Sequence, residues 1–357
     1  MSASTTPSAA AAERREIVEV ASELGRRELA PRALELDERR PGALEAAWQH
    51  VTEVGFDRAL VPVEEGGAGL DPETLMICLE EIATGDGGVA MLALLSNAAL
   101  AVLPSELLAG ACPGERWALV PCPPEGLPTG ARIRTGGDPG AETVEGELCP
   151  ALGALGADGV VVVGREPEPA VIAFRAGAPG IETTPSEPQL GLRAANAARL
   201  SFCAATAEVS LPAAEAVVAA AQSLALLRVG AAAIARGVAR RAQELAVAYA
   251  ETRIQGGGPI LEYDAVREML AGMAIRLAAA PCAPSAVDAV AANVIAVKVA
   301  TTDAAVATTT DAVQVFGGTG YMHETGIEKL MRDAKHLQLW PEPNWIGRDL
   351  VAGSLSA

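Results

Sequence analysis

The chain has 357 residues, half of them hydrophobic, and a formal net charge of −18 at pH 7. This length predicts two or three packed units, and the hydrophobic content is ample for their cores. The acidity argues against nucleic acid or an anionic membrane surface as a partner, although a local basic pocket can still bind an anionic ligand. Aromatic residues make up only 3%, so alanine, leucine and valine must fill the interior.

Cysteine and histidine usage argues against a metal site. Six cysteines are scattered without C-x-x-C spacing, and only three histidines are present. We therefore expect reduced thiols in a cytoplasmic protein and no metal. The start MSASTTPSAAAAERRE has no long apolar core, so it does not predict a signal peptide. The Ala-rich stretches 213–235 and 286–307 contain Arg228, Lys298 and Asp303, which favours buried helices over membrane spans.

Residues 1–116 are predicted to form a helical domain. Apolar residues recur at helical spacing from Ile17 to Leu29, from Leu44 to Val54 and from Leu75 to Ile82. The glycine-rich segment GFDRALVPVEEGGAGL, from Gly55 to Leu70, is predicted to be a turn between the second and third of these helices.

Residues 117–211 change in character and are predicted to form a small β-barrel or sandwich. Proline and glycine become frequent, and short apolar runs lie between them at 160–163, 171–174 and 198–202. Short β-branched runs bounded by turn residues are typical of strands.

Residues 212–357 return to a helical pattern. One segment ends at Arg253, the turn QGGGPI follows, and further helices are predicted from Tyr263 to Ala280 and from Ser285, a plausible N-cap, to Phe316. Long apolar-striped segments joined by short turns predict a four-helix bundle packed against the first domain. Their continuous apolar surface predicts a dimer or a dimer of dimers.

The most specific pattern is the run DAVQVFGGTGYMHETGIEKLMRDAKHLQLWPEPNWIGRDL, from Asp311 to Leu350. Gly317, Gly318 and Gly320 interrupt a helical pattern and let another molecule approach the backbone closely. The run resembles the C-terminal signature of the acyl-CoA dehydrogenases, roughly D-A-x-Q-x-x-G-G-x-G-Y…R-D-A…Q-I-Y-E-G-T-N-x-I-x-R. The residues that match in register are Gln314, Gly317, Gly318, Gly320, Tyr321, Arg332, Asp333, Ala334, Lys335, Gln338, Asn344, Ile346 and Arg348.

This resemblance spans most of the chain in the order helical, β, helical. It implies an α+β, mainly α fold: an N-terminal helical domain at 1–116, a middle β-barrel or sandwich domain at 117–211 and a C-terminal four-helix bundle at 212–357. It also implies FAD as cofactor and an acyl-CoA thioester as the substrate, oxidised at its CH–CH group. The partners implied are an electron-accepting protein and a homo- or hetero-dimer or tetramer of related subunits.

The active-site part of the signature departs from the family. The family's catalytic glutamate, in Y-E-G-T, matches Pro341 here, and Glu342 falls on the glycine position. Some members keep the glutamate on an earlier helix, at the position that matches Leu227 before Arg228. Proline and leucine cannot remove a proton. Glu342 is therefore the remaining candidate base, and the alternative is an ordinary solvated loop acid.

The flavin-ring part of the pattern is also missing. Family members carry a T-E-P-x-A-G-S stretch and a W-I-T-N stretch whose hydroxyls and backbone contact the ring. ALVPCPPEG at 118–126 and ELCPALGAL at 147–155 replace them, and Val120 stands at the threonine position. The resemblance thus implies a weakened contact to this subunit's own flavin ring.

This chain matches the family pattern more closely at the residues that hold the adenine-diphosphate end of the cofactor. In the family they reach across the dimer interface to a neighbour's flavin. Arg253 offers a bidentate partner for a pyrophosphate, and Gly256 and Asp264 replace a family phenylalanine and glutamine. The candidate cofactor-binding residues are Arg253, Gln314, Gly317, Gly318 and Asn344.

Three functions remain open on this pattern. The leading hypothesis is a subunit of an acyl-CoA dehydrogenase that completes the FAD site of a related partner. The second is a non-catalytic structural subunit, and the third is a flavoenzyme of altered chemistry that needs no base. Elsewhere, Arg240 and Arg241 are expected on a solvated helix face, and His323 and His336 lack partners at metal-ligand spacing.

Overall fold

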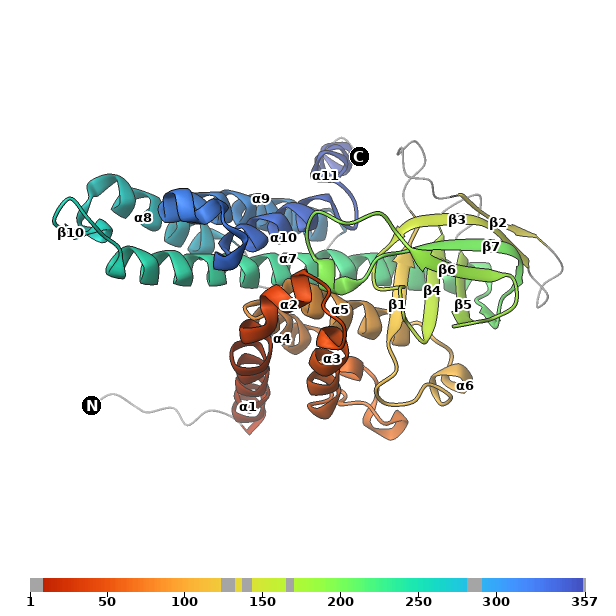
Figure 1. The fold of residues 1–357 in the computed structure, drawn as a ribbon. Coiled ribbons are helices and arrows are strands. Elements are labelled where there is room, and N and C mark those ends of the chain that lie inside the picture. The colour runs from red at the N-terminus through yellow and green to blue at the C-terminus, as the bar shows by residue number, and fades with distance from the viewer. Residues whose placement is uncertain (1–8, 123–131, 137–142, 165–169, 281–290, 356–357) are drawn as a thin grey trace, which may run out of the picture.

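The computed structural model describes residues 9–122, 132–136, 143–164, 170–280 and 291–355. Its parts follow the expected order of helical, β and helical segments, and the mainly helical fold with a sheet-containing middle part is confirmed (Figure 1). The domain boundaries at 116 and 211 stay a division drawn from the sequence.

The first part consists of short helices that lie beneath the bundle in Figure 1. Asp71 and Asp86 begin two of them, since their carboxylates accept hydrogen bonds from the backbone of Thr74 and Val89. The bounds are α1 Ala9–Glu23, a π-helical turn Leu24–Leu29, a 3-10 turn Ala30–Arg32, α2 Ala33–Asp37, α3 Ala43–Glu53, 3-10 turns Phe56–Arg58 and Val63–Glu65, α4 Pro72–Ala83, α5 Gly87–Leu100 and α6 Ser105–Leu108.

The middle part contains two four-stranded sheets. One has the order β1-β4-β5-β8, with β1 and β4 parallel and its other pairs antiparallel. The other has the antiparallel order β2-β3-β7-β6. The strands are β1 Trp117–Pro121, β2 Arg132–Gly136, β3 Thr143–Ala151, β4 Gly159–Gly164, β5 Ala170–Arg175, β6 Ile181–Pro185, β7 Ala198–Thr206 and β8 Val209–Ser210, with a 3-10 turn at Arg193–Ala195.

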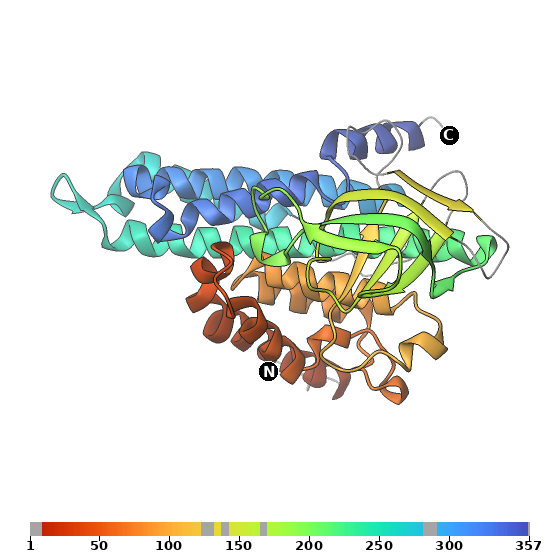
Figure 2. The ribbon, with the colours of Figure 1, turned by 45° about the vertical axis from the view of Figure 1, so that its right-hand side comes forward.

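The last part is a bundle built on one 40-residue helix, α7. In Figure 2, α7 runs from the β domain at one end to a small hairpin at the other. The elements are α7 Ala213–Thr252, the hairpin strands β9 Ile254–Gln255 and β10 Gly258–Pro259, 3-10 turns Ile260–Glu262, Gly317–Tyr321 and His323–Thr325, α8 Asp264–Ala279, α9 Ala291–Phe316, α10 Ile327–Leu339 and α11 Asn344–Ser354. The predicted N-cap Ser285 lies outside the described residues.

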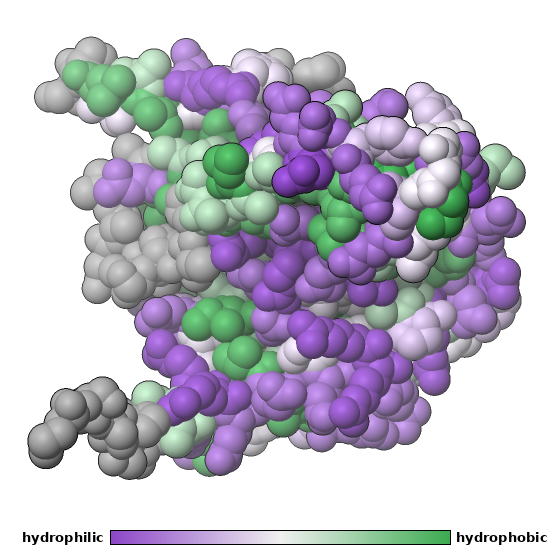
Figure 3. Space-filling model, turned by 90° about the vertical axis from the view of Figure 1, so that its left-hand side faces the viewer, coloured by the Kyte–Doolittle hydropathy of each residue, from purple (hydrophilic) through white to green (hydrophobic). Residues whose placement is uncertain are grey.

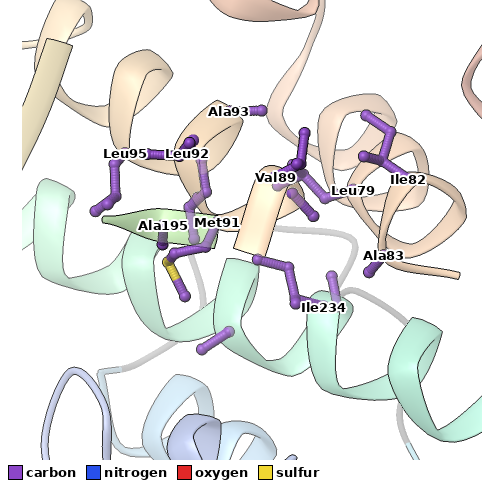
Figure 4. Packing of buried hydrophobic residues seen from close by; sticks show 14 of the residues in the cluster. Leu79, Ile82, Ala83, Val89, Met91, Leu92, Ala93, Leu95, Ala195 and Ile234 are labelled. Carbon is purple, nitrogen blue, oxygen red and sulfur yellow. The ribbon is translucent and has the colours of Figure 1, made fainter. Parts of the chain in front are cut away.

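The main core lies where α4 and α5 pack against α7. Figure 4 shows Met91 of α5 and Ile234 of α7 in the space between these two helices, with Leu95 and Ile82 on opposite sides of the cluster. Every residue of α5 is buried, so this helix has no polar face and its apolar residues show no helical period. By length and composition α7 could cross a membrane, but 67% of its most apolar window is buried inside the protein, as expected of a core helix.

Buried ion pairs join the three parts. The chain has three lysines, and two of them, Lys298 and Lys329, are buried. Lys329 Nζ lies 2.6 Å from Asp333 and 2.9 Å from Asp86 at the start of α5. Asp333 also accepts from the backbone of Leu192 at 2.6 Å. One ionic cluster therefore ties α10 to the first helical part and to the end of the β domain.

The expectation of a solvated Arg240 is wrong. Arg240 is half-buried and pairs with both Glu80 and Glu81 of α4, and Arg236 also pairs with Glu80. These pairs join α4 to α7, and the two residues of each pair are about 160 positions apart in the sequence. Helical spacing within α7 alone could not reveal them.

Candidate functional site

The candidate base Glu342 is buried, with 4% of its surface exposed. It lies in the turn between α10 and α11, and its Oε1 accepts from Nε of Arg228 on α7 at 2.9 Å. Arg228 is also buried, at 6%. The structure therefore excludes a solvated loop acid and shows a desolvated ion pair in its place.

The backbone of the same turn is held by Lys298 of α9. Its Nζ donates to the carbonyl oxygen of Glu342 at 2.6 Å, to Oδ1 of Asn344 at 2.7 Å and to the carbonyl oxygen of Gln338 at 3.3 Å. The Asn344 amide donates to Thr302 at 2.9 Å and to Asp303 at 2.7 Å. The side-chain amide of Asn344, a predicted cofactor residue, is thus hydrogen-bonded within the protein.

The charge state of Lys298 reflects this burial. Desolvation lowers the pKa of Lys298 to about 8, from an ordinary 10.5. The Glu342 carboxylate opposes this change, the Arg228 guanidinium adds to it, and the Asp303 carboxylate opposes it. The cations of Lys298 and Arg228 therefore lie near the buried carboxylate of Glu342 and the half-buried carboxylate of Asp303.

The two positions at which the family keeps its base are occupied by apolar groups. Pro341 precedes Glu342 in the turn, and the Leu227 side chain is fully buried in the main core. Glu342 directly follows Pro341, and its partner Arg228 directly follows Leu227. Its ion pair with Arg228 directs Oε1 at α7, so the acid is engaged before any substrate arrives.

The flavin-ring positions that the structure describes are closed and apolar. Val120 of β1 is 3% exposed and packs in the core between the two sheets. In the 147–155 segment, Leu148, Ala151 and Leu152 are buried hydrocarbons as well. These side chains offer no hydroxyl to a flavin ring. Residues 123–131, which hold the rest of the first stretch, lie outside the described residues.

The predicted diphosphate residues lie at the opposite end of the bundle. Arg253 follows the last turn of α7, where its backbone amide bonds to the carbonyl oxygen of Tyr249 at 2.9 Å. Its side chain is exposed and has no ion pair or side-chain hydrogen bond within the described ranges. A free guanidinium on this acidic protein is suited to an anionic group such as a diphosphate.

Gln314, Gly317 and Gly318 are exposed at the adjoining end of α9. A side chain added at either glycine would meet no atom within 4 Å, so the backbone here is open to a ligand. The two helix ends are in contact, because the Tyr249 ring stacks on Phe316 with centroids 4.2 Å apart. Tyr249 Oη also lies 3.2 Å from Oγ1 of Thr319. The fold therefore brings Arg253 and the glycines to one end.

The two halves of the predicted cofactor site are far apart within one chain. Arg228 and Arg253 both belong to the continuous run of α7 and its C-cap. At 1.5 Å per residue their 25-residue separation is about 37 Å. A single dinucleotide does not span that distance. The end with Arg253 is exposed and cationic, whereas the region near Glu342 is buried and its carboxylate is already paired with Arg228.

Sequence reasoning missed the Arg228–Glu342 pair and the role of Lys298. The pair joins residues 114 positions apart, so no local spacing predicts it. A weak signal was present, since Arg228 and Lys298 each interrupt a long apolar helix. Within the described ranges no group of three His, Cys, Asp or Glu side chains is placed so that it could hold a metal ion.

Comparison with known proteins agrees with this architecture. The family profile "Acyl-CoA dehydrogenase, N-terminal domain" matches residues 11–106, and "Acyl-CoA dehydrogenase, C-terminal domain" matches residues 217–355. A cyclohex-1-ene-1-carbonyl-CoA dehydrogenase from Geobacter metallireducens is 30% identical over 95% of this chain and 96% of its own length.

Solved structures show the same fold at lower identity. The butyryl-CoA dehydrogenase from Megasphaera elsdenii has a TM-score of 0.84 at 22% identity and covers 100% of both chains. An acyl-CoA dehydrogenase complexed with FAD from Bacillus anthracis has a TM-score of 0.86 at 22% identity, over 98% of this chain and 67% of that one.

Proposed function

The chain belongs to the acyl-CoA dehydrogenase family, and from that premise we propose that it is a subunit that completes the FAD site of a neighbouring, related subunit. The assembly is an FAD-dependent oxidoreductase that acts on the CH–CH group of an acyl-CoA thioester. The observation that carries the proposal is the contrast between Arg253 at one end of α7, exposed and unpaired within the described residues, and Glu342, which is buried and paired with Arg228 about 37 Å away along the helix.

The end of the bundle supplies the part that reaches the neighbour. Arg253 binds the diphosphate as a charge-assisted, bidentate partner. The open backbone at Gly317 and Gly318 allows the adenosine to approach closely. Gln314 lies exposed on the same helix end and adds a polar contact. These groups need no rearrangement, because none of the three is engaged by another described side chain.

The opposite end supports the loss of this subunit's own ring site. Val120 and Leu152 fill the described ring positions with buried hydrocarbon. Pro341 and Leu227 occupy the two base positions, and Glu342 is paired with Arg228. When bound, FAD accepts the hydride from the β carbon of the thioester. The residues that bind the ring and remove the α proton come, in this proposal, from the neighbour.

A homomeric enzyme that uses Glu342 as its base is the second candidate. It is favoured by one observation, namely that Glu342 is a buried carboxylate in the turn that the family uses for catalysis. For this role Arg228 would have to release the carboxylate when the thioester binds. The two remaining functions, a purely structural subunit and a flavoenzyme without a base, both require that Glu342 take no part in catalysis.

The location we propose is the cytoplasm. The five cysteines that the structure describes are all free thiols, which suits a reducing compartment. Electrons leave the assembly through a separate acceptor protein, as the resemblance implies.

The deciding experiment is to purify the chain alone and together with a related acyl-CoA dehydrogenase subunit whose T-E-P, W-I-T and Y-E-G motifs are intact. Flavin absorbance and reduction by acyl-CoA thioesters are measured for both preparations. Our proposal expects little FAD and no reduction for the chain alone, and both in the complex. Full FAD content with thioester reduction in the chain alone would establish the homomeric enzyme.

A further inference from the structure

All three tyrosines of this chain lie at the end of the bundle that carries Arg253. Tyr249 is on the last turns of α7, Tyr263 precedes α8, and Tyr321 closes the 3-10 turn after α9. Figure 3 looks onto this side of the molecule, where apolar residues are interspersed among hydrophilic ones. In a protein with only 3% aromatic residues, such a concentration calls for a specific role.

The three tyrosines differ in how free their rings are. One face of the Tyr249 ring is covered by Phe316. Tyr321 is 86% exposed, and its hydroxyl has no hydrogen bond within the described part of the chain. Tyr263 is 45% exposed and anchored, because its hydroxyl donates to the carbonyl oxygen of Gln255 at 2.8 Å. Only Tyr263 combines an accessible ring with a fixed orientation.

The anchored phenol also explains the glycine at position 256. Gly256 has φ +58, in the left-handed region, and a β carbon there would collide with the Tyr263 hydroxyl. The Tyr263 phenol and a side chain at 256 are therefore mutually exclusive. The family pattern has a phenylalanine at the position of Gly256. Here the Tyr263 phenol, from position 263, occupies the space that a side chain at 256 would need.

We propose that Tyr263 is the aromatic platform on which the adenine of the neighbour's FAD stacks, in place of the side chain missing at Gly256. Arg253 ends the helix one residue before the hairpin that Tyr263 closes. The hairpin holds the two together, since the Ile260 amide donates to the Arg253 carbonyl oxygen at 2.8 Å and the Tyr263 amide donates to the Ile260 carbonyl oxygen at 3.1 Å. The backbone thus keeps the residues that carry a cation and an aromatic ring in one hairpin, and a nucleoside diphosphate needs both kinds of group.

The charges nearby are consistent with a nucleobase rather than a second phosphate beside Tyr263. Asp264 follows it directly with a fully exposed carboxylate, and Arg267 lies 3.9 Å from that carboxylate. The Glu262 carboxylate packs beside Gly258 on the other side. An anionic group would be repelled here, whereas a neutral purine would not. The phosphate therefore belongs at Arg253 and the base at Tyr263.

This inference rests on the proposed function. FMN carries the flavin ring without the adenosine, so a comparison of FAD with FMN isolates the contribution of the adenosine contact. FAD and FMN release rates are measured by flavin fluorescence on the assembled complex carrying Tyr263→Ala, Tyr263→Phe or Arg253→Ala. We expect Tyr263→Ala to speed FAD release about tenfold, on the order of one lost aromatic stack. FMN release should not change, and Tyr263→Phe should stay close to the wild type, because it keeps the ring.

Three results would overturn the inference. If Tyr263→Ala leaves FAD release unchanged while Arg253→Ala speeds it, the platform is wrong and the proposed function stands. If neither variant changes FAD release, the whole bundle end is not a cofactor site and both proposals fail. If Tyr263→Phe behaves like Tyr263→Ala, or if FMN release changes equally, Tyr263 only holds the hairpin through its hydroxyl and does not stack.

Discussion

Nε of Arg228 lies 2.9 Å from Oε1 of Glu342, and both side chains are buried. This relationship matters for the interpretation of the turn between α10 and α11, because Glu342 is the one acid in that turn and the pair gives it a structural partner. Removing two charges from water is costly, so such a pair persists only where each charge compensates the other.

Breaking this pair should destabilise the protein. Arg228→Met leaves a buried carboxylate unpaired and should lower the free energy of unfolding by about 3–5 kcal/mol. The double variant Arg228→Met with Glu342→Gln should recover most of that loss, as measured by urea denaturation. Arg241→Met, which breaks the more exposed pair with Glu244, serves as the control and should cost about 1 kcal/mol or less. An Arg228→Met effect no larger than the control would contradict a buried pair.

Glu342→Gln separates the two candidate functions. Glutamine keeps an oxygen that can accept from Arg228 but cannot remove a proton. If the partner supplies the base, the complex should retain thioester-dependent turnover within a few fold. A loss of about a hundredfold or more, the range expected when a general base is removed, would identify Glu342 as that base.

Lys298 should make stability depend on pH in an unusual direction. Its pKa of about 8 in the fold lies below its ordinary 10.5, so between these values the unfolded chain binds more protons. The free energy of unfolding therefore rises with pH across this window, by about 3 kcal/mol for the full gap. Below about pH 8 both states are protonated and the cost of burying the charge is fully present.

The measurement compares wild type with Lys298→Met between pH 7 and pH 10.5. The difference in unfolding free energy should shift in favour of the wild type as pH rises. Lys335→Met is the matched control, since Lys335 is the one exposed lysine, and its difference should stay flat. A flat profile for Lys298→Met as well would show that Lys298 is not desolvated.

Arg253→Ala should weaken FAD binding in the complex without unfolding the subunit. A lost charge-assisted contact corresponds to roughly a tenfold or larger rise in the dissociation constant. Arg267→Ala is the control, because Arg267 lies near the same end but pairs only with Asp264. Equal FAD retention in Arg253→Ala and Arg267→Ala complexes would rule out a diphosphate role for Arg253.

Much of the fold follows from the sequence because its patterns are local. The helix predicted from Tyr263 to Ala280 is observed as Asp264–Ala279, and the run at 160–163 is observed within the strand Gly159–Gly164. The helix α5 was not distinguished, because it is apolar on every face and gives no period. Periodicity reports one buried face, and a helix without a solvated face carries no such signal.

The site could be predicted only in part, for a different reason. Arg253 and the glycines at the bundle end are marked by motif positions and by helix ends, which are local features. The pairs of Glu342 with Arg228 and of Arg240 with Glu81 join distant segments, and only the packed fold reveals them. The place of Tyr263 depends on Gly256 having no side chain, a steric relationship that sequence spacing does not show.

The most direct test of the account is the FAD content of an assembly of known mass. The complex of this chain with a related subunit should contain one FAD per two chains, and the chain purified alone should contain little. Flavin absorbance together with protein concentration and light scattering gives that ratio. A homomer of this chain with one FAD in every subunit would contradict the account and make Glu342 the leading candidate for the catalytic base.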